Sequence, residues 1–246
     1  MTGRRVVLVT GASSGIGRAT ALRAAAAGWD VAVGYRTGWQ AADETARSCE
    51  AHGVRAVTAP GDVTTAAGVD SSFAMVDEQF GRLDALVTSA GVVSPLGRVE
   101  EMTEDRIARV LQVNVVGTLL CAGAAVRRMS THHGGQGGVI VTVSSRAAVR
   151  GGAGEYVDYA ASKAAVDAVT VGLAAEVLAE GIRVVGVRPG VIATGIHAPG
   201  RLERVSPSLP MQRAGTPDEV AAAIVWLMSD EASYVVGTLL DVGGGR

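Results

Sequence analysis

Short runs of β-branched and aliphatic residues alternate with longer helical patterns along the whole chain, and this alternation constrains the fold most. The first run, 4–10 (RRVVLVT), is apolar on both sides and precedes a helical pattern at 15–28 that ends at Gly28. Strands that are apolar on both faces and separated by helices are typical of a parallel sheet covered on both sides. We therefore expect an α/β fold, a Rossmann-like doubly wound domain.

The same pattern predicts the order of the elements. Strands are expected at 4–10, 30–35, 54–60, 83–91, 137–145, 181–190 and 238–245. Helices are expected at 15–28, 39–53, 66–80, 103–112, 114–130, 157–180 and 216–230, with a loop and partly helical region over 191–216. The last helix opens with a capping box of Thr216 and Glu219, with Pro217 at its first position.

No internal boundary interrupts this alternation. The 33 glycines are scattered and form no linker. We therefore expect one domain over 1–246, with a dinucleotide-binding part at about 1–135 and a catalytic and substrate part at about 136–246. The 24 acidic and 22 basic residues give a net charge of −2 without a run of five like charges, which argues against nucleic acid or an anionic membrane as partner.

Cysteine usage and the lack of targeting patterns predict a cytoplasmic protein. Cys49 and Cys121 have no metal-ligand or CxxC spacing, and two reduced thiols are a better interpretation than a disulfide. The first apolar run is too short for a signal peptide, and no stretch of about 18 apolar residues predicts a membrane span. His132 and His133 lack acidic or thiol neighbours, so we expect a polar loop there and no metal.

A glycine-rich turn, TGASSGIG at 10–17, joins the first predicted strand to the first predicted helix. Such a turn lets backbone approach a phosphate, and the helix offers free N–H groups and the positive end of its dipole. Alone, the string could be an ordinary tight turn, but its place in a βα unit favours a dinucleotide site. The residues expected to contact the cofactor here are Gly11, Ser13, Ser14, Gly15, Ile16 and Gly17.

The end of the second predicted strand distinguishes the two nicotinamide dinucleotides. The strand ends Gly34-Tyr35-Arg36, without an acid that would bind a ribose 2′-hydroxyl. Arg36 can pair with a 2′-phosphate in a bidentate way, assisted by the hydroxyl of Ser14 or Thr37. We therefore predict NADP over NAD; the simpler alternative is that Arg36 is a solvated surface residue.

Two further loops complete the predicted cofactor site. Asp62-Val63, after the third strand, could hold the adenine amine, and Ala90-Gly91, after the fourth, could let the backbone lie against the adenosine ribose. Without the glycine-rich turn, both pairs would be ordinary loop residues.

A tyrosine and a lysine lie four residues apart in YVDYAASKAAV, at Tyr159 and Lys163. Side chains at i and i+4 of a helix occupy the same face, one turn apart. On its own, such a pair is usually a surface contact. The motifs in the rest of the chain decide between a surface contact and a catalytic pair.

Taken together, these motifs resemble the short-chain dehydrogenase/reductases of the classical type over the whole chain. The residues that carry the resemblance are TGASSGIG (10–17), Asp62-Val63, Ala90-Gly91, Asn114, Ser144-Ser145, YAASK (159–163) and RPGVIAT (188–194). The chain is most similar to the bacterial branch with glucose 1-dehydrogenase-like and 3-oxoacyl-carrier-protein reductase-like members. The resemblance implies a seven-stranded parallel sheet, a nicotinamide cofactor and a homotetramer, in which the helix with Trp226 and the last strand often form an interface.

The resemblance also implies a catalytic set of Asn114, Ser145, Tyr159 and Lys163. Reduction of a carbonyl by hydride needs a proton for the forming alkoxide, but a free tyrosine has a pKa near 10. We expect the ammonium of Lys163 to lower the pKa of Tyr159 toward the operating pH, so that Tyr159 acts as the acid and base. Ser145 would donate to the substrate oxygen.

The remaining roles follow from the resemblance alone. Lys163 would also bind the nicotinamide ribose, and Asn114 would hold a water that links Lys163 to solvent. The segment with Pro189, Gly190, Ile192 and Thr194 would hold the carboxamide and pyrophosphate. Each has a simpler interpretation: Asn114 could cap the helix after it, and Pro189-Gly190 is a turn signature by itself.

The chain departs from the family pattern in two places. Thr88-Ser89 replaces the family's Asn-Asn, which puts side-chain contacts in doubt but not the role of the backbone. Ser145 precedes Tyr159 by fourteen residues, where thirteen are common, so the glycine-rich loop between them has absorbed one residue. We take Ser145 as the catalytic serine and keep Ser144 as the alternative.

The sequence therefore predicts an NADP-preferring oxidoreductase that interconverts a small-molecule carbonyl and a secondary alcohol. The alternatives are an NAD-linked sugar or polyol dehydrogenase and, from another class, a dinucleotide-sensing protein without chemistry. A sensing protein would not need the serine, tyrosine and lysine together.

The substrate cannot be identified from these residues. The segment 191–216 is expected to form much of the substrate pocket, because loops carry specificity on such scaffolds. Its Arg201, Arg204 and Arg213 could meet an acidic substrate, or could simply be solvated. Glu155 and Tyr156 precede Tyr159 closely enough to reach substrate, and His197 reads as a solvated loop residue.

Overall fold

Seven strands form a single sheet in the computed structural model, which describes residues 3–196 and 199–245. The strands are β1 (Val6–Thr10), β2 (Asp30–Tyr35), β3 (Ala56–Pro60), β4 (Ala85–Thr88), β5 (Gly138–Val143), β6 (Ile182–Pro189) and β7 (Leu239–Val242). Their order is β3-β2-β1-β4-β5-β6-β7, and every neighbouring pair is parallel. The predicted seven-stranded parallel sheet is therefore confirmed.

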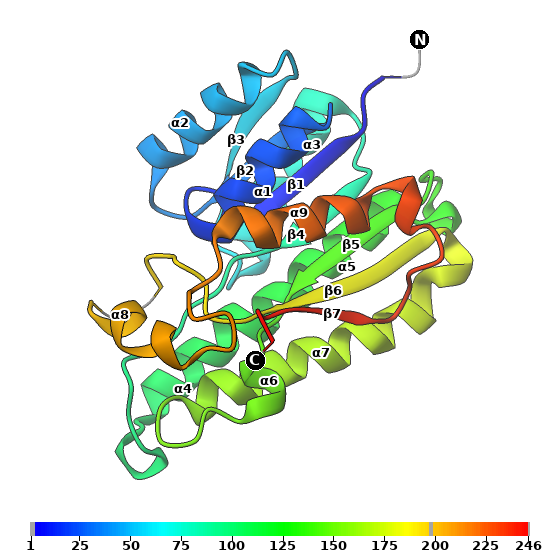
Figure 1. Ribbon diagram of the computed structural model, residues 1–246. Coiled ribbons are helices and arrows are strands. Elements are labelled where there is room, and N and C mark those ends of the chain that lie inside the picture. Colours follow the sequence, from blue (N-terminus) through cyan, green and yellow to red (C-terminus); the bar gives the residue numbers. More distant parts are fainter. Residues whose placement is uncertain (1–2, 197–198, 246) are drawn as a thin grey trace.

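Helices cover both faces of the sheet, also as predicted (Figure 1). They are α1 (Gly15–Ala26), α2 (Trp39–Glu50), α3 (Ala66–Phe80), α4 (Glu104–Leu111), α5 (Gly117–Met129), α6 (Ala147–Arg150), α7 (Val157–Val177), α8 (Arg201–Val205) and α9 (Pro217–Met228). Short 3₁₀ turns occur at Val99–Glu101, Thr131–His133, Leu178–Glu180, Ser206–Ser208 and Asp230–Ala232. On one face α1 packs against α2 and α9, and on the other α5 packs against α3 and α7.

Two apolar clusters fill the space between the sheet and its helices. Successive side chains of a strand point to opposite faces, so Val7 and Val9 pack with Ile224 of α9, whereas Leu8 packs with Phe73 of α3. All five side chains are fully buried. The strands are thus apolar on both faces because both faces are core.

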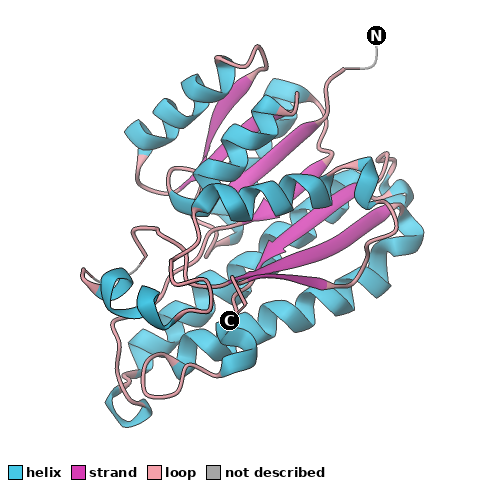
Figure 2. Cartoon of the chain, viewed as in Figure 1, coloured by secondary structure: helices cyan, strands magenta, loops and turns pink. Residues whose placement is uncertain are grey.

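The loops that follow the strands gather at one end of the sheet (Figure 2). β1 lies between β2 and β4, so the chain leaves β1 toward one edge and later returns to its other side. In doubly wound sheets, ligands bind at the carboxyl ends of the strands at this reversal point. The topology therefore puts the turn after β1 beside the loop after β4.

One local prediction is wrong. The two helices predicted at 103–112 and 114–130 form a continuous helical segment, in which a π-helical turn at Gln112–Val116 joins α4 to α5. Asn114 lies inside this turn and therefore does not cap the following helix. The extra residue that such a turn accommodates is a common device at functional sites.

The segment Glu104–Met129 is long and apolar enough to cross a membrane by length and composition, with a mean hydropathy of 1.5. However, 44% of its 18-residue window is buried inside the fold. Core helices pass the same test, and Ala124 and Ala125 lie in the core cluster under the sheet. The segment is therefore weak evidence for a membrane span.

Helix ends follow their local signals. Thr216 Oγ1 accepts from the backbone N–H of Glu219 at 3.2 Å, and the Glu219 carboxylate accepts from the N–H of Thr216 at 2.8 Å. The predicted capping box of α9 is therefore confirmed.

Cys49 and Cys121 are both buried and free, as predicted, and burial raises their pKa to about 11 and about 12.

Candidate active site

A cavity of about 1140 Å³ opens at the carboxyl ends of β1, β4, β5 and β6. Its walls include all the predicted cofactor residues except Asp62, and three of the four predicted catalytic residues. The fourth, Asn114, lies behind Gly91, where a Cβ on the glycine would sit 3.4 Å from Asn114 Oδ1. The cavity thus brings together nearly all the positions that the sequence pattern selected.

The glycines of the turn after β1 are required by close backbone contacts. Gly11 has φ +66°, and a Cβ there would lie 2.9 Å from Cα of Ala90. A Cβ on Gly17 would lie 2.4 Å from the carbonyl oxygen of Gly11. Within the described chain, Ser14 makes no side-chain capping bond to α1, so its first N–H groups remain available to an anion. This cradle fits the pyrophosphate of a dinucleotide.

Arg36 lines the cavity, and its guanidinium faces Asp62, which does not line it. Nη1 of Arg36 lies 3.6 Å from Oδ2 of Asp62, and both side chains are partly exposed. A hydrogen bond from the backbone N–H of Thr64 is the main cause that holds the pKa of Asp62 below its usual value. A guanidinium therefore lies directly after the end of β2.

The loops after β4 and β6 close the sides of the same cavity. The backbone N–H of Ala90 donates to Thr10 Oγ1 at 3.1 Å, which ties the loop after β4 to the end of β1. A Cβ on Gly15 would lie 3.4 Å from Cγ2 of Thr194, so the loop after β6 reaches the glycine-rich turn. Pro189 at the end of β6 accepts from the backbone N–H of Arg146 at 2.9 Å.

Tyr159 and Lys163 lie one turn apart on α7, and both line the cavity. Burial raises the pKa of Tyr159 to about 12, against the opposing effect of a side-chain hydrogen bond with Ser145. The ring of Tyr156 meets that of Tyr159 edge-on at 5.7 Å between centroids. Tyr159 is therefore a neutral phenol at neutral pH.

Lys163 is buried, with 5% of its surface exposed. Its Nζ donates to the carbonyl oxygen of Val143 at 2.7 Å and lies 5.8 Å from the Tyr159 ring centroid. Burial lowers the pKa of Lys163 to about 8, while the charge of Asp167 raises it.

These geometries correct one prediction. We expected Lys163 to lower the pKa of Tyr159, but the pKa of Tyr159 is raised, and Lys163 is not among the causes that act on it. The physical reason is that both groups are desolvated, which disfavours both charged forms, and that the amine is turned toward Val143.

The two candidate serines have different partners. Ser144 Oγ is buried and donates to the carbonyl oxygen of Lys163 at 3.0 Å. Ser145 instead interacts with Tyr159, and its Oγ accepts from the N–H of Ala147 at 3.1 Å. The geometry therefore favours Ser145 over Ser144 as the residue that meets substrate.

The longer stretch between Ser145 and Tyr159 contains α6 and a glycine-rich turn. Gly151, Gly152 and Gly154 all have positive φ, between +61° and +79°. A side chain is rarely tolerated in such conformations. These glycines allow the stretch to turn back so that Tyr159 meets Ser145.

Asn114 has all its side-chain polar atoms occupied by protein. Its Oδ1 accepts from the N–H of Val92 at 2.9 Å, and its Nδ2 donates to the Val92 carbonyl at 3.0 Å and to Ser162 Oγ at 2.9 Å. Asn114 therefore fixes the loop after β4 against α7.

An ion pair between buried Arg201 and partly exposed Glu155 lines the cavity. Arg201 of α8 is 4% exposed and bonds Glu155 through both nitrogens, at 3.2 and 2.8 Å. It also donates to the Tyr156 hydroxyl at 3.2 Å. Arg213 pairs with Glu219 in the same way. Neither Arg201 nor Arg213 is therefore free to meet an acidic substrate, and the pairing of Arg201 with Glu155 had no signal in the sequence.

His132 and His133 lie in the polar 3₁₀ turn before β5, and no cluster of metal-ligating side chains occurs among the described residues. His197 lies outside the described residues.

The departure at Thr88 leaves a buried hydroxyl without a hydrogen-bond partner in the described part of the chain. Because an unpaired buried hydroxyl costs free energy, Thr88→Val is expected to raise the free energy of unfolding by about 1 kcal/mol. Thr142→Val is the matched control, since Thr142 Oγ1 lies 2.6 Å from Thr170 Oγ1 and its loss should destabilise the protein. Urea unfolding measures both, and destabilisation by Thr88→Val would contradict the account.

Together, the parallel sheet, the anion cradle after β1 and the Ser145-Tyr159-Lys163 group define a dinucleotide-binding oxidoreductase of the Rossmann type. Comparison with known proteins gives the family. A family model described as Enoyl-(Acyl carrier protein) reductase matches residues 11–246. The solved structure of a short-chain type dehydrogenase/reductase from Mycobacterium marinum superposes with a TM-score of 0.91 at 33% identity, covering 98% of this chain and 94% of that one.

Curated relatives match over nearly the full length. An uncharacterized oxidoreductase of Escherichia coli, YgfF, is 49% identical over 98% of this chain and 99% of its own. A 3-oxoacyl-[acyl-carrier-protein] reductase of Synechocystis is 36% identical, covering 98% and 96%, and glucose 1-dehydrogenase 2 of Bacillus subtilis is 35% identical, covering 100% and 95%. The chain belongs to the short-chain dehydrogenase/reductase family and is an NAD(P)-dependent oxidoreductase. The predicted family and branch are thereby confirmed.

Proposed function

We propose that the protein is an NADP-preferring enzyme that interconverts a carbonyl and a secondary alcohol, with Ser145, Tyr159 and Lys163 as its catalytic residues. One observation carries the proposal. The three side chains line the same cavity as the glycine-rich cradle, and Tyr159 is hydrogen-bonded to Ser145. A dinucleotide-sensing protein without chemistry would not require this arrangement.

When bound, the nicotinamide supplies or accepts the hydride at the carbonyl carbon. Ser145 donates a hydrogen bond to the substrate oxygen and stabilises its developing charge. Tyr159 is protonated at neutral pH because burial raises its pKa, so it can deliver the phenolic proton to the oxygen during reduction. Lys163, whose Nζ lies 5.8 Å from the Tyr159 ring centroid, would stabilise the phenolate once it forms and would hold the nicotinamide ribose. Asn114 positions the loop after β4.

Preference for NADP is supported by the end of β2. Arg36 and Thr37 line the cavity, together with Ser13 and Ser14 of the glycine-rich turn. A guanidinium and three hydroxyls that line one cavity suit a 2′-phosphate better than a ribose diol. The roles proposed for the other cofactor residues follow the family resemblance: Val63 would lie near the adenine, and Thr194 would hold the carboxamide or pyrophosphate. Both residues line the cavity.

Arg36→Asp tests the cofactor preference. We expect kcat/KM for NADPH to fall about 100-fold, because a charge-assisted bidentate contact is lost and a carboxylate then faces the phosphate. The kcat/KM for NADH should change much less. Arg47→Asp, a charge reversal of an exposed helical ion pair, is the control. A clear NADH preference of the native protein would refute the preference for NADP.

The lining does not by itself select a substrate class. The cavity wall includes the apolar Val92, Pro95, Leu96 and Ile196 and the buried Arg201, which is paired with Glu155, but also Arg109 and Arg150. A panel of ketones, sugars and acyl thioesters assayed with NADPH and NADH identifies the class. The full-length match to a glucose 1-dehydrogenase supports the second candidate, an NAD-linked sugar or polyol dehydrogenase, which would turn over sugars with NAD⁺.

We also propose one domain over 1–246, a homotetramer and a cytoplasmic location. One sheet spans both the cofactor part and the catalytic part of the chain. Trp226 of α9 is 40% exposed and Leu240 of β7 is 37% exposed, as expected of surfaces that meet in an assembly. The free, buried thiols suit a reducing compartment. Sedimentation equilibrium measures the assembly.

A further inference from the structure

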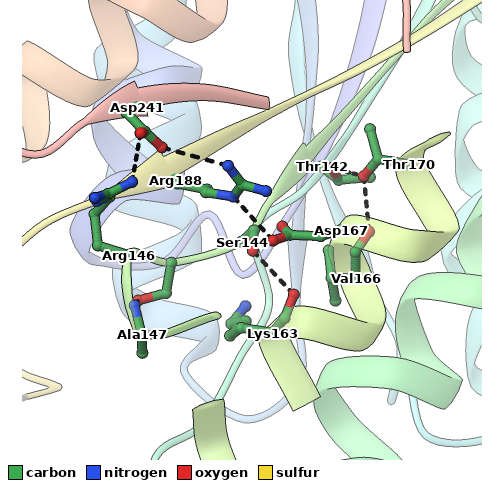
Figure 3. A network of polar contacts seen from close by, with 11 residues as sticks. Thr142, Ser144, Arg146, Ala147, Lys163, Val166, Asp167, Thr170, Arg188 and Asp241 are labelled. Atoms are coloured by element: carbon green, nitrogen blue, oxygen red, sulfur yellow. Dashed lines mark hydrogen bonds and ion pairs between the residues drawn. The ribbon is translucent and has the colours of Figure 1, made fainter. Parts of the chain in front are cut away.

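A row of alternating charges runs from the edge strand β7 to Asp167 on α7 (Figure 3). One carboxylate oxygen of Asp241 accepts from Nη1 of Arg146, and the other lies 3.7 Å from Nη1 of Arg188. Nε of Arg188 donates to Oδ2 of Asp167 at 2.9 Å. Asp167 follows Lys163 by four residues on α7, so the two side chains leave the same face of the helix.

The pair of Asp167 and Arg188 is shielded from water, with 13% and 21% of the side-chain surfaces exposed. Oδ1 of Asp167 is buried and has no hydrogen-bond partner in the described chain. A desolvated carboxylate with a spare oxygen acts strongly on neighbouring charges, because the surrounding dielectric constant is low. The ammonium on the same helix face is that of Lys163, on which the charge of Asp167 acts.

The other ionisable groups near Lys163 are either neutral or paired with a countercharge. Tyr159 is a neutral phenol, because burial raises its pKa. Asp158 is bonded by Arg106 through two nitrogens, at 2.8 and 3.2 Å. The guanidinium groups of Arg146 and Arg188 both interact with the carboxylate of Asp241. Asp167 is the carboxylate that opposes the effect of burial on Lys163.

We propose that Asp167 and Arg188 are a positioning pair for Lys163, in which the carboxylate favours the ammonium form and the guanidinium limits that effect. Asp241 supports the pair by holding Arg188 from the other side. The inference rests on the proposed role of Lys163 in catalysis, but it makes a prediction about the amine that needs no turnover. The pair would set the fraction of Lys163 that is charged at neutral pH.

The chain contains a single lysine, Lys163, so the amine can be observed directly. Protein grown with lysine carrying ¹³C at Cε gives one NMR signal, whose shift titrates with the amine. In cofactor-free protein, we expect a pKa of about 8 for the native chain. Asp167→Asn keeps an acceptor for Arg188 but removes the charge, and should lower the pKa by about one.

Arg188→Gln should move the pKa in the opposite direction, because Asp167 then loses its countercharge. The double variant Asp167→Asn/Arg188→Gln should lie between the two single variants. Asp77→Asn, which makes the same chemical change in an exposed pair with Arg128, should leave the pKa unchanged. If Asp167→Asn fails to fold, Asp241→Asn should still lower the pKa of Lys163, by a smaller amount, because the positive charge of Arg188 is then less neutralised.

Shifts of the two single variants in the same direction, or no shift in either, would overturn the positioning pair. The pH profile of NADPH-dependent reduction provides the second readout, because its Lys163 limb should move with the NMR pKa. Failure of the proposed function would look different: the NMR shifts would persist while Lys163→Met retained native turnover. A merely structural pair would change stability without moving the amine pKa in opposite directions.

Discussion

Tyr159→Phe is expected to lower kcat for carbonyl reduction about 1000-fold while NADPH still binds. The substitution removes only the phenolic oxygen, so the ring keeps its edge-on contact with Tyr156 and the cavity keeps its shape. Loss of a positioned general acid typically costs 100- to 10,000-fold, and here water would have to supply the proton. Single-turnover reduction measured by loss of NADPH absorbance gives the rate, and fluorescence titration gives NADPH affinity.

Two tyrosines provide matched controls. Tyr156→Phe removes the hydroxyl that accepts from Arg201, and we expect less than a tenfold change in kcat. Tyr234→Phe alters a fully exposed ring and should change nothing. Native turnover in Tyr159→Phe, or an equal loss in Tyr156→Phe, would remove Tyr159 from the role of acid.

The pH dependence of the two directions should differ. The pKa of Tyr159 is raised to about 12 in the cofactor-free protein, so the phenol is protonated across the neutral range and can donate in reduction. Alcohol oxidation needs the phenolate as base, so its rate should rise with pH through the neutral and mildly alkaline range. A bell-shaped oxidation profile centred near pH 7 would contradict this assignment.

The fold could be predicted because its signals are local and redundant. The inner strands are apolar on both faces, and several helices have their own boundary signal, such as the capping box at Thr216 and Glu219. The boundary between α4 and α5 could not be predicted, because a π-helical turn has no sequence signature apart from its context. The simpler alternative for Asn114, a cap of the following helix, is excluded because Asn114 lies at the centre of that turn.

The residues of the site could be predicted from spacing, but their electrostatics could not. The spacing of Tyr159 and Lys163 predicts a shared face, yet the direction of the Lys163 amine depends on the Val143 carbonyl from another strand. Burial, which dominates both pKa values, is a property of the whole fold. Arg188 was noted only as part of a motif, and its link to Asp167 required the register of β6 beside α7.

Lys163→Met is expected to raise stability below pH 8 and to lower kcat 100- to 1000-fold. The folded pKa of Lys163 is about 8, against 10.5 for the free side chain. Between these values the unfolded chain binds more protons, so native stability rises with pH and the penalty for burying the ammonium is complete below pH 8. At 1.36 kcal/mol per pKa unit, removing this charge should stabilise the protein by about 3 kcal/mol at pH 6.5.

The gain from Lys163→Met should shrink as pH rises and vanish near pH 10.5, where the amine of the unfolded native chain also loses its proton. Urea unfolding at several pH values measures this trend. Lys163→Arg separates charge from position, because its guanidinium remains charged at every pH tested. It should therefore be as inactive as Lys163→Met but show no gain in stability at pH 6.5. A stability difference between native protein and Lys163→Met that stays constant with pH would mean that the amine is not the buried, weakly basic group on which the proposed chemistry depends.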